Sequence, residues 1–208
     1  NAAKRARLVR LSLEQQLPLV LMLDGAGERA SNGSERYPVA PNDLQLVADL
    51  KGQVPVVTLV LGTSAGHGAL TGMFADLIIM CEGAAMFTAG PPLVEASMGF
   101  KATPEELGGA KMHTAQSGVA HNLAATEKEA FEQARYFLSL LPQRAGEPLP
   151  VLDHGQEDNS QDALLDLIPP AINQGYDMSK VIELLADERS VFEMQPSYGR
   201  SLIVALAR

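Results

Sequence analysis

The chain has 208 residues, of which 46% are hydrophobic, and its formal net charge is −9. This size suits one ordinary domain, or one domain with part of another. The acidic balance argues against a nucleic-acid partner and offers no basic face for an anionic membrane. No apolar run reaches the roughly 18 residues that span a bilayer, and no signal pattern opens the chain, so we expect a cytoplasmic protein.

The N-terminal segment reads as a surface helix over residues 2–16, which ends before Pro18. Its basic side is expected to be a solvated face rather than a phosphate clamp, and consists of Arg5, Arg7 and Arg10. Residues 18–24 form a continuous apolar run that predicts a buried strand. That strand leads into a glycine turn at residues 25–27.

The polar stretch 28–41 is typical of an exposed loop, and Asn42 or Asp43 is placed to cap a helix that stops at Gly52. The pattern of residues 54–83 then predicts strand, glycine turn, helix and strand. The chain is organised around this stretch.

Later elements are shorter. We expect a strand at 84–89, a helix at 93–98 and a loop-like segment at 99–110. A second tight connection at 117–121 precedes an amphipathic helix, in which Thr126 and Glu129 form a capping box. That helix ends before Pro142.

Residues 142–161 shift to Pro, Gly and acidic residues, which predicts a linker. Beyond it we expect a helix at 178–186 capped by Asp177, and strands near 191–195 and 202–207. This small unit has too little apolar area to fold alone. We expect it to be poorly tied to the rest of the chain.

The two glycine turns are the main functional signal. Glycine lets the backbone come close to a ligand, and amides at a helix start favour an anion. The second turn lacks the Lys-Ser/Thr of a phosphate loop and the GxGxxG of a dinucleotide site. An oxyanion pocket for an enolate or tetrahedral oxygen is therefore one interpretation, and a turn that only permits tight packing is the other. Both turns are expected at the carboxyl end of the sheet.

Several segments together resemble the carboxyltransferase (β) subunits of biotin-dependent acyl-CoA carboxylases, such as the propionyl-, methylcrotonyl- and geranyl-CoA carboxylases. The resemblance covers the whole chain in one order. The matching segments are Asp24-Gly25-Ala26-Gly27-Glu28-Arg29, Gly62-Thr63-Ser64-Ala65-Gly66-His67-Gly68-Ala69, Ala89-Gly90-Pro91-Pro92-Leu93-Val94, Glu106-Leu107-Gly108-Gly109-Ala110, and His113-Thr114 with Ser117-Gly118-Val119-Ala120.

The resemblance implies an α/β protein of the crotonase (ClpP/crotonase-like) fold, a superhelix of repeated ββα units that is incomplete here. It places residues 1–141 in the later part of an N-domain, 142–161 in a linker and 162–208 at the entry of a C-domain. The implied reaction transfers a carboxyl group from carboxybiotin to an acyl-CoA enolate, which backbone amides stabilise. Biotin would be carried by a biotin carboxylase or biotin carrier partner, and N-domain/C-domain contacts would form a homo-oligomer. The chain alone is expected to be inactive, because it holds half of the two-domain site.

The residues implied in the site follow from the matching turns. Those expected to act in catalysis are Gly25, Ala26, Gly27, Gly66, His67 and Gly68. Those expected to bind substrate are Gly62, Thr63, Ser64, Ala65, Ala69, Gly90, Pro91 and Pro92. Two departures from the family bear on substrate and rate: Ala26 stands where a glycine is usual, and His67 where a small residue is common.

Three alternatives remain open. A crotonase-type acyl-CoA hydratase or isomerase would need acids at the pocket, for which Glu28 and Glu95 are candidates by position. A serine hydrolase would use Ser64 and His67, for which no third catalytic group is identifiable in the sequence. The third alternative is a non-catalytic assembly fragment.

The remaining reactive side chains favour structural roles. Cys81 lies inside an apolar strand, which is typical of an inert buried thiol. The other histidines lack metal-ligand spacing and are expected to be satisfied loop or surface residues without a metal; they are His113, His121 and His154.

Overall fold

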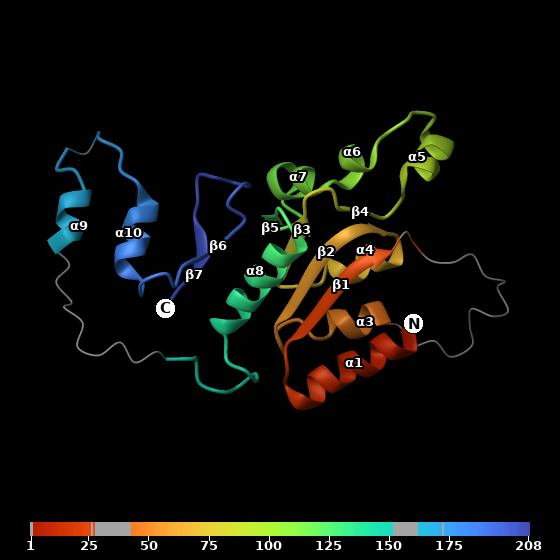
Figure 1. The fold of residues 1–208 in the computed structure, drawn as a ribbon, viewed down its shortest axis with the longest axis horizontal. Coiled ribbons are helices and arrows are strands. Elements are labelled where there is room, and N and C mark those ends of the chain that lie inside the picture. The colour runs from red at the N-terminus through yellow and green to blue at the C-terminus, as the bar shows by residue number, and fades with distance from the viewer. Residues whose placement is uncertain (1, 26, 28–42, 152–161, 172) are drawn as a thin grey trace.

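The computed structural model describes residues 2–25, 27, 43–151, 162–171 and 173–208. Its centre is a sheet with the strand order β1-β2-β3-β5, in which every pairing is parallel (Figure 1). A further strand, β4, pairs with the second half of β2. The strands are β1 (Leu19–Gly25), β2 (Val56–Ala65), β3 (Leu77–Cys81), β4 (Ala85–Phe87) and β5 (Asn122–Ala124).

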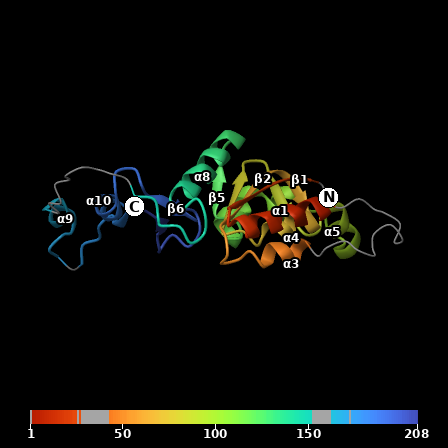
Figure 2. The ribbon, with the colours of Figure 1, turned by 90° about the horizontal axis from the view of Figure 1, so that it is seen from below.

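The sheet carries the core. All of β3 and the first half of β2 are buried, as a central parallel strand covered on both faces requires. Helix α8 (Glu127–Ser139) contacts β3 and β2, and α4 (His67–Gly72) contacts β1 and β2. Figure 2 shows α8 and α3 (Asp43–Ala48) on opposite sides of the strands, with α1 (Ala2–Gln15) beside α3.

Most predicted elements are confirmed, but two predicted boundaries were wrong. The glycine turn was expected from residue 62, whereas β2 continues as strand to Ala65 because β4 pairs with Thr63, Ser64 and Ala65. Residues 99–110 were expected to be a loop, but they contain α6 (Pro104–Gly108). Thr103 caps α6 in a complete capping box with Glu106, a signal that the sequence carried.

One burial prediction was also wrong. The strand at 18–24 was expected to be buried, but β1 lies at the edge of the described sheet, and Met22 is 64% exposed. In α1 the apolar residues at helical spacing are Ala3, Ala6, Leu8, Leu11 and Leu13, but only Ala6 of these packs inward, together with Val9 and Ser12. Three further short elements were not predicted: β5, α7 (Ala110–Met112) and the π-helix η1 (His113–Ser117).

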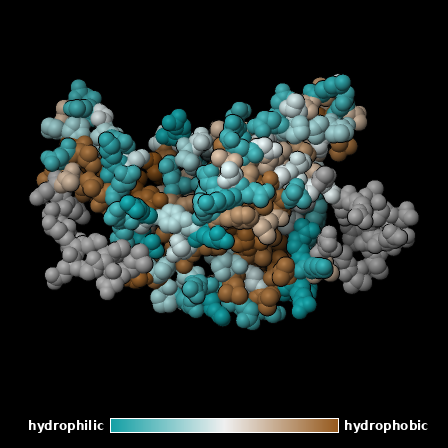
Figure 3. All heavy atoms as spheres, viewed as in Figure 1, coloured by the Kyte–Doolittle hydropathy of each residue, from teal (hydrophilic) through white to brown (hydrophobic). Residues whose placement is uncertain are grey.

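The C-terminal unit contains α9 (Asp162–Leu167), α10 (Met178–Leu185) and an antiparallel hairpin of β6 (Phe192–Met194) and β7 (Val204–Leu206). The hairpin lies against the main body, where the side-chain amide of Asn122 donates to the carbonyl of Glu193 at 3.0 Å. Figure 3 shows hydrophilic and hydrophobic residues interspersed over one face of the molecule. Phe192 is 5% exposed and packs on the rings of Tyr136 and Phe137. The prediction that this unit is poorly tied to the rest was therefore wrong for the hairpin.

Residues 142–151 form no helix or strand, and the rest of the predicted linker, 152–161, lies outside the described residues. The loop predicted at 28–41 also lies outside them. Within the described parts of the chain, no helix combines the length and apolar character needed to cross a membrane.

Candidate functional site: two glycine turns at the end of the sheet

The two glycine turns lie side by side, as the sequence predicted. Gly25, at the end of β1, is the register partner of Ser64 in β2. Gly27 lies just beyond it, where a methyl group on its Cα would be 3.8 Å from Cβ of Ala65. The ends of β1 and β2, which are far apart in the sequence, therefore lie together at one end of the sheet. Ala26 lies outside the described residues.

Gly66 turns the chain from β2 into α4. Its φ of 61° and ψ of −127° are outside the range that side-chain-bearing residues adopt without strain. Its N–H donates to the carbonyl of Phe87 at 3.0 Å, so this amide is not available to a ligand. Gly27 also has a positive φ, of 114°. Both turns therefore depend on glycine for their backbone path.

Helix α4 begins at His67, directly after this turn. The first N–H groups of a helix have no acceptor inside the helix. We find no acceptor for the N–H of His67 or Gly68 among the described residues. These two amides are the donors that the turn can offer to an oxygen that gains negative charge.

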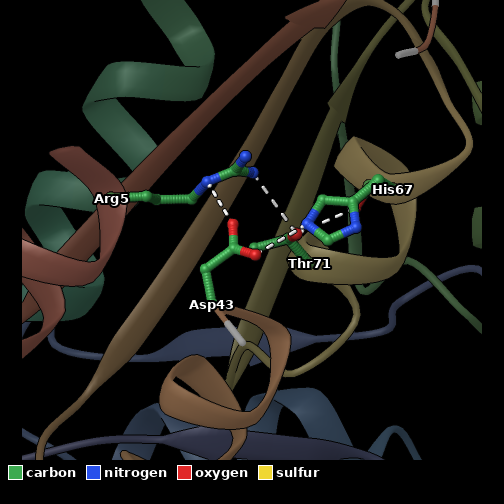
Figure 4. A network of polar contacts seen from close by, with 4 residues as sticks. All are labelled: Arg5, Asp43, His67 and Thr71. Atoms are coloured by element: carbon green, nitrogen blue, oxygen red, sulfur yellow. Dashed lines mark hydrogen bonds and ion pairs between the residues drawn. The ribbon is translucent and has the colours of Figure 1, made fainter. Parts of the chain in front are cut away.

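The imidazole of His67 is held by Asp43 of α3, and Asp43 in turn is paired with Arg5 of α1 (Figure 4). Nε2 lies 2.9 Å from Oδ1 of Asp43, whose side chain is only 4% exposed. Nε of Arg5 lies 2.8 Å from Oδ2, the other carboxylate oxygen, and forms an ion pair with it. Arg5 also reaches Oγ1 of Thr71 at 3.4 Å, and that hydroxyl donates to the carbonyl of His67.

This network corrects the prediction for Arg5, which was expected on a solvated face together with Arg7 and Arg10. Only Arg7 and Arg10 are exposed. The network also occupies Nε2 of His67, which is bonded to Asp43. The backbone amide of His67 is not part of this network. Sequence reasoning missed Asp43 and Arg5 as partners, and no local spacing could have revealed them, since Asp43 and His67 are 24 residues apart.

The predicted substrate-binding residues fall into two groups. Residues 62–65 and Ala69 border the turn, but Ser64 and Ala69 are 2% and 1% exposed and offer little side-chain surface. A methyl group at Gly62 would overlap the carboxylate of Asp24, which therefore lies against the strand. The second group, Gly90, Pro91 and Pro92, forms the start of α5 (Pro91–Met98).

The geometry disfavours the hydrolase. Ser64 is buried, and no hydrogen bond joins it to His67, although both residues are described. For the hydratase, Glu95 lies on an exposed face of α5, with Lys101 at 3.9 Å, and Glu28 lies outside the described residues.

The remaining candidates behave as structural groups. Burial, followed by the nearby Glu127 and Glu129 carboxylates, raises the pKa of the Cys81 thiol, which keeps it protonated. Nδ1 of His121 accepts from the N–H of Ile78 at 2.9 Å. His113 is also fully bonded, and His154 lies outside the described residues. No cluster of three or more His, Cys, Asp or Glu suited to a metal occurs among the described residues.

Comparison with known proteins places these features in a family. The carboxyl transferase domain family matches residues 1–208. The biotin-dependent acetyl-/propionyl-coenzyme A carboxylase beta5 subunit of Mycobacterium leprae is 34% identical over 99% of this chain and 39% of its own length. The methylmalonyl-CoA decarboxylase subunit alpha of Veillonella parvula is 31% identical over 100% of this chain and 41% of its own length.

Among solved structures, transcarboxylase 12S with hydrolysed methylmalonyl-coenzyme A bound superposes with a TM-score of 0.89 at 28% identity. The match covers 100% of this chain and 41% of that chain, and it confirms the predicted crotonase-like fold. The chain thus spans about 40% of the length of the curated relatives that it matches.

Proposed function

The chain belongs to the carboxyl transferase domain family, and from this premise we propose that its parent protein transfers a carboxyl group from carboxybiotin to the enolate of an acyl-CoA. The observation that carries the proposal is the pairing of the two glycine turns. Gly25 and Gly27 end beside Ser64 and Ala65, and the first amides of α4 follow directly.

These residues suit the charge that the reaction develops. Removal of an α-proton from a thioester leaves negative charge on the thioester oxygen, and fixed amide donors stabilise such an oxygen without reorganisation. We assign this role to the N–H groups of His67 and Gly68, supported by the turn at Gly25 and Gly27. Gly66 contributes by its backbone path, since its own N–H is taken by Phe87.

The cofactor fits this arrangement. When bound, carboxybiotin supplies the carboxyl group and the ureido nitrogen that takes the α-proton. No histidine or carboxylate of this chain then has to act as the base. This agrees with His67, whose Nε2 is bonded to Asp43, and with His113, both of whose ring nitrogens are bonded within the protein.

We further propose the partners that this chemistry needs. Biotin would arrive on a biotin carboxylase or biotin carrier subunit, and the second half of the site would come from the C-domain of another copy. The M. leprae relative is named as a carboxylase subunit, and transcarboxylase 12S is described as a hexamer, which supports an oligomeric complex. The division at residues 141 and 161 and the cytoplasmic location stay predictions.

A pair of variants at His67 tests the role of the amide. His67 is the first residue of α4, a position where proline is tolerated because the N–H has no partner inside the helix. His67→Pro removes both the N–H and the imidazole, and His67→Ala removes only the imidazole. In the full-length parent with its biotin-bearing partner, we expect His67→Pro to lower kcat by about 10²–10³ relative to His67→Ala.

Equal rates for the two variants would reject the His67 amide as the oxyanion donor. The reaction itself is tested by supplying the complex with ATP, bicarbonate and a panel of acyl-CoA thioesters. Absence of a carboxylated product with every thioester would reject the carboxyltransferase assignment.

A further inference from the structure

His113 is a buried histidine with both ring nitrogens bonded. It begins the π-helix η1, and its side chain makes one contact inside this turn and one outside it. Nε2 lies 2.8 Å from the carbonyl oxygen of Met86, and Nδ1 lies 2.8 Å from Oγ of Ser117. Because a carbonyl only accepts, Nε2 carries the proton, and in the neutral ring Nδ1 accepts from the Ser117 hydroxyl.

The space for this contact is left by a glycine. A methyl group at Gly108 would overlap the Met86 carbonyl and lie 3.0 Å from Nε2 of His113. The segments 106–110 and 113–117 carry part of the family resemblance but had no assigned role. Both therefore meet at one carbonyl of β4, that of Met86. The neighbouring Ala110 N–H also donates to Ala84, directly before β4, at 3.1 Å.

Strand β4 connects this point to the glycine turn. Met86 is the register partner of Ser64, and the carbonyl of the next residue, Phe87, accepts the N–H of Gly66 at 3.0 Å. β4 runs only from Ala85 to Phe87, so few ladder bonds determine its position. A side chain that holds Met86 therefore also constrains the carbonyl on which Gly66 depends.

We propose that His113 is a positioning residue, which fixes β4 through the Met86 carbonyl and thereby holds the Gly66 turn in the shape that presents the α4 amides. His113 itself does not contact substrate. This inference rests on the proposed function for its kinetic consequence, but its structural consequence is independent of the reaction.

The test compares variants that differ in whether they can donate to Met86. His113→Leu removes the donor and leaves a buried carbonyl without a partner. His113→Gln restores an N–H near the position of Nε2. His121→Asn is the matched control, because His121 also bonds a backbone group, the Ile78 N–H, but in β3 rather than β4.

Two readouts are measured on the full-length parent in its complex, below the unfolding temperature of each variant. The first is amide hydrogen exchange of the peptide that covers residues 62–70. We expect faster exchange in His113→Leu, near-normal exchange in His113→Gln, and no change in His121→Asn. The second is the kinetics: we expect His113→Leu to lower kcat roughly 10- to 100-fold, with KM for acyl-CoA within about twofold.

Unchanged exchange of residues 62–70 in His113→Leu, or an equal increase in His121→Asn, would overturn the inference even if the complex proves to catalyse another reaction. A fall in stability without any change in exchange or kcat would assign His113 a purely structural role and would equally overturn it. If His113→Leu does not fold, the same comparison is made with Ser117→Ala, which removes the partner of Nδ1 and should give a smaller change of the same sign.

Discussion

His67 and Asp43 come from the first residues of α4 and α3, and their side chains meet at 2.9 Å between Nε2 and Oδ1. Asp43 is the more deeply buried of the two, with 4% of its side chain exposed against 35% for His67. A buried carboxylate is costly unless it is paired, and Arg5 supplies its permanent positive charge. The contact ties the helix after the glycine turn to α1 and α3.

The first prediction concerns the removal of that charge. Arg5→Met keeps an unbranched apolar stem but removes the charged group, which leaves Asp43 buried with only His67 beside it. We expect the free energy of unfolding to fall by about 3 kcal/mol. Lys128→Ala, which breaks the exposed pair with Glu132, should cost less than about 0.5 kcal/mol. Urea unfolding of both variants makes the comparison, and equal losses would show that Asp43 is not effectively buried.

The second prediction concerns the turn. Gly66→Ala places a side chain at a φ of 61° and ψ of −127°, and we expect it to lower the unfolding free energy by about 1–3 kcal/mol. Gly25→Ala is the control, because its Cβ would have nothing within 4 Å and its φ is not positive. Thermal unfolding of the two variants checks this, and a Gly25→Ala loss as large as that of Gly66→Ala would contradict the strain argument.

The third prediction concerns the C-terminal hairpin. Phe192→Ala removes a ring that packs on Tyr136 and Phe137, and we expect a loss of about 3–5 kcal/mol. Leu202→Ala should have little effect, since Leu202 is 71% exposed. Denaturant unfolding followed by aromatic fluorescence measures both. A small loss for Phe192→Ala would restore the prediction that the hairpin is poorly tied.

The fourth prediction concerns acid. Burial, followed by the nearby Lys51 charge, lowers the pKa of His121, and Asp76 opposes this only in part. The folded protein therefore binds fewer protons at this site than the unfolded chain. The neutral His121 therefore contributes its full stabilisation above the ordinary histidine pKa of 6.5. This contribution is lost as pH falls through the lower pKa of the folded state.

His121→Asn is the matched variant, because an amide oxygen can still accept from the Ile78 N–H but does not titrate. We expect the unfolding free energy of the wild type to fall more steeply between about pH 7 and pH 5 than that of His121→Asn. Parallel pH profiles of the two proteins would show that His121 is not held neutral.

Much of the fold could be predicted because the signals are local. The buried strands 54–61 and 77–81 are apolar runs, and the helices at 127 and 178 begin at capping residues that the structure confirms, Thr126 and Asp177. Thr126 accepts from the Glu129 N–H as expected, although the Glu129 carboxylate accepts from Ala125 rather than from the cap itself. The proximity of the two glycine turns was predicted from their equivalent places after parallel strands.

What the sequence by itself determined is therefore the order of the longer elements, the glycine-dependent turns and the resemblance to one family. Only the tertiary structure decided which polar groups remain for a ligand. The Gly66 amide is taken by Phe87, the His67 ring by Asp43, and the Met86 carbonyl by His113. Local periodicity and capping depend on neighbours within a few residues, whereas these bonds join segments 20 or more residues apart. Their partners follow from strand register and helix packing, which no short stretch of sequence encodes.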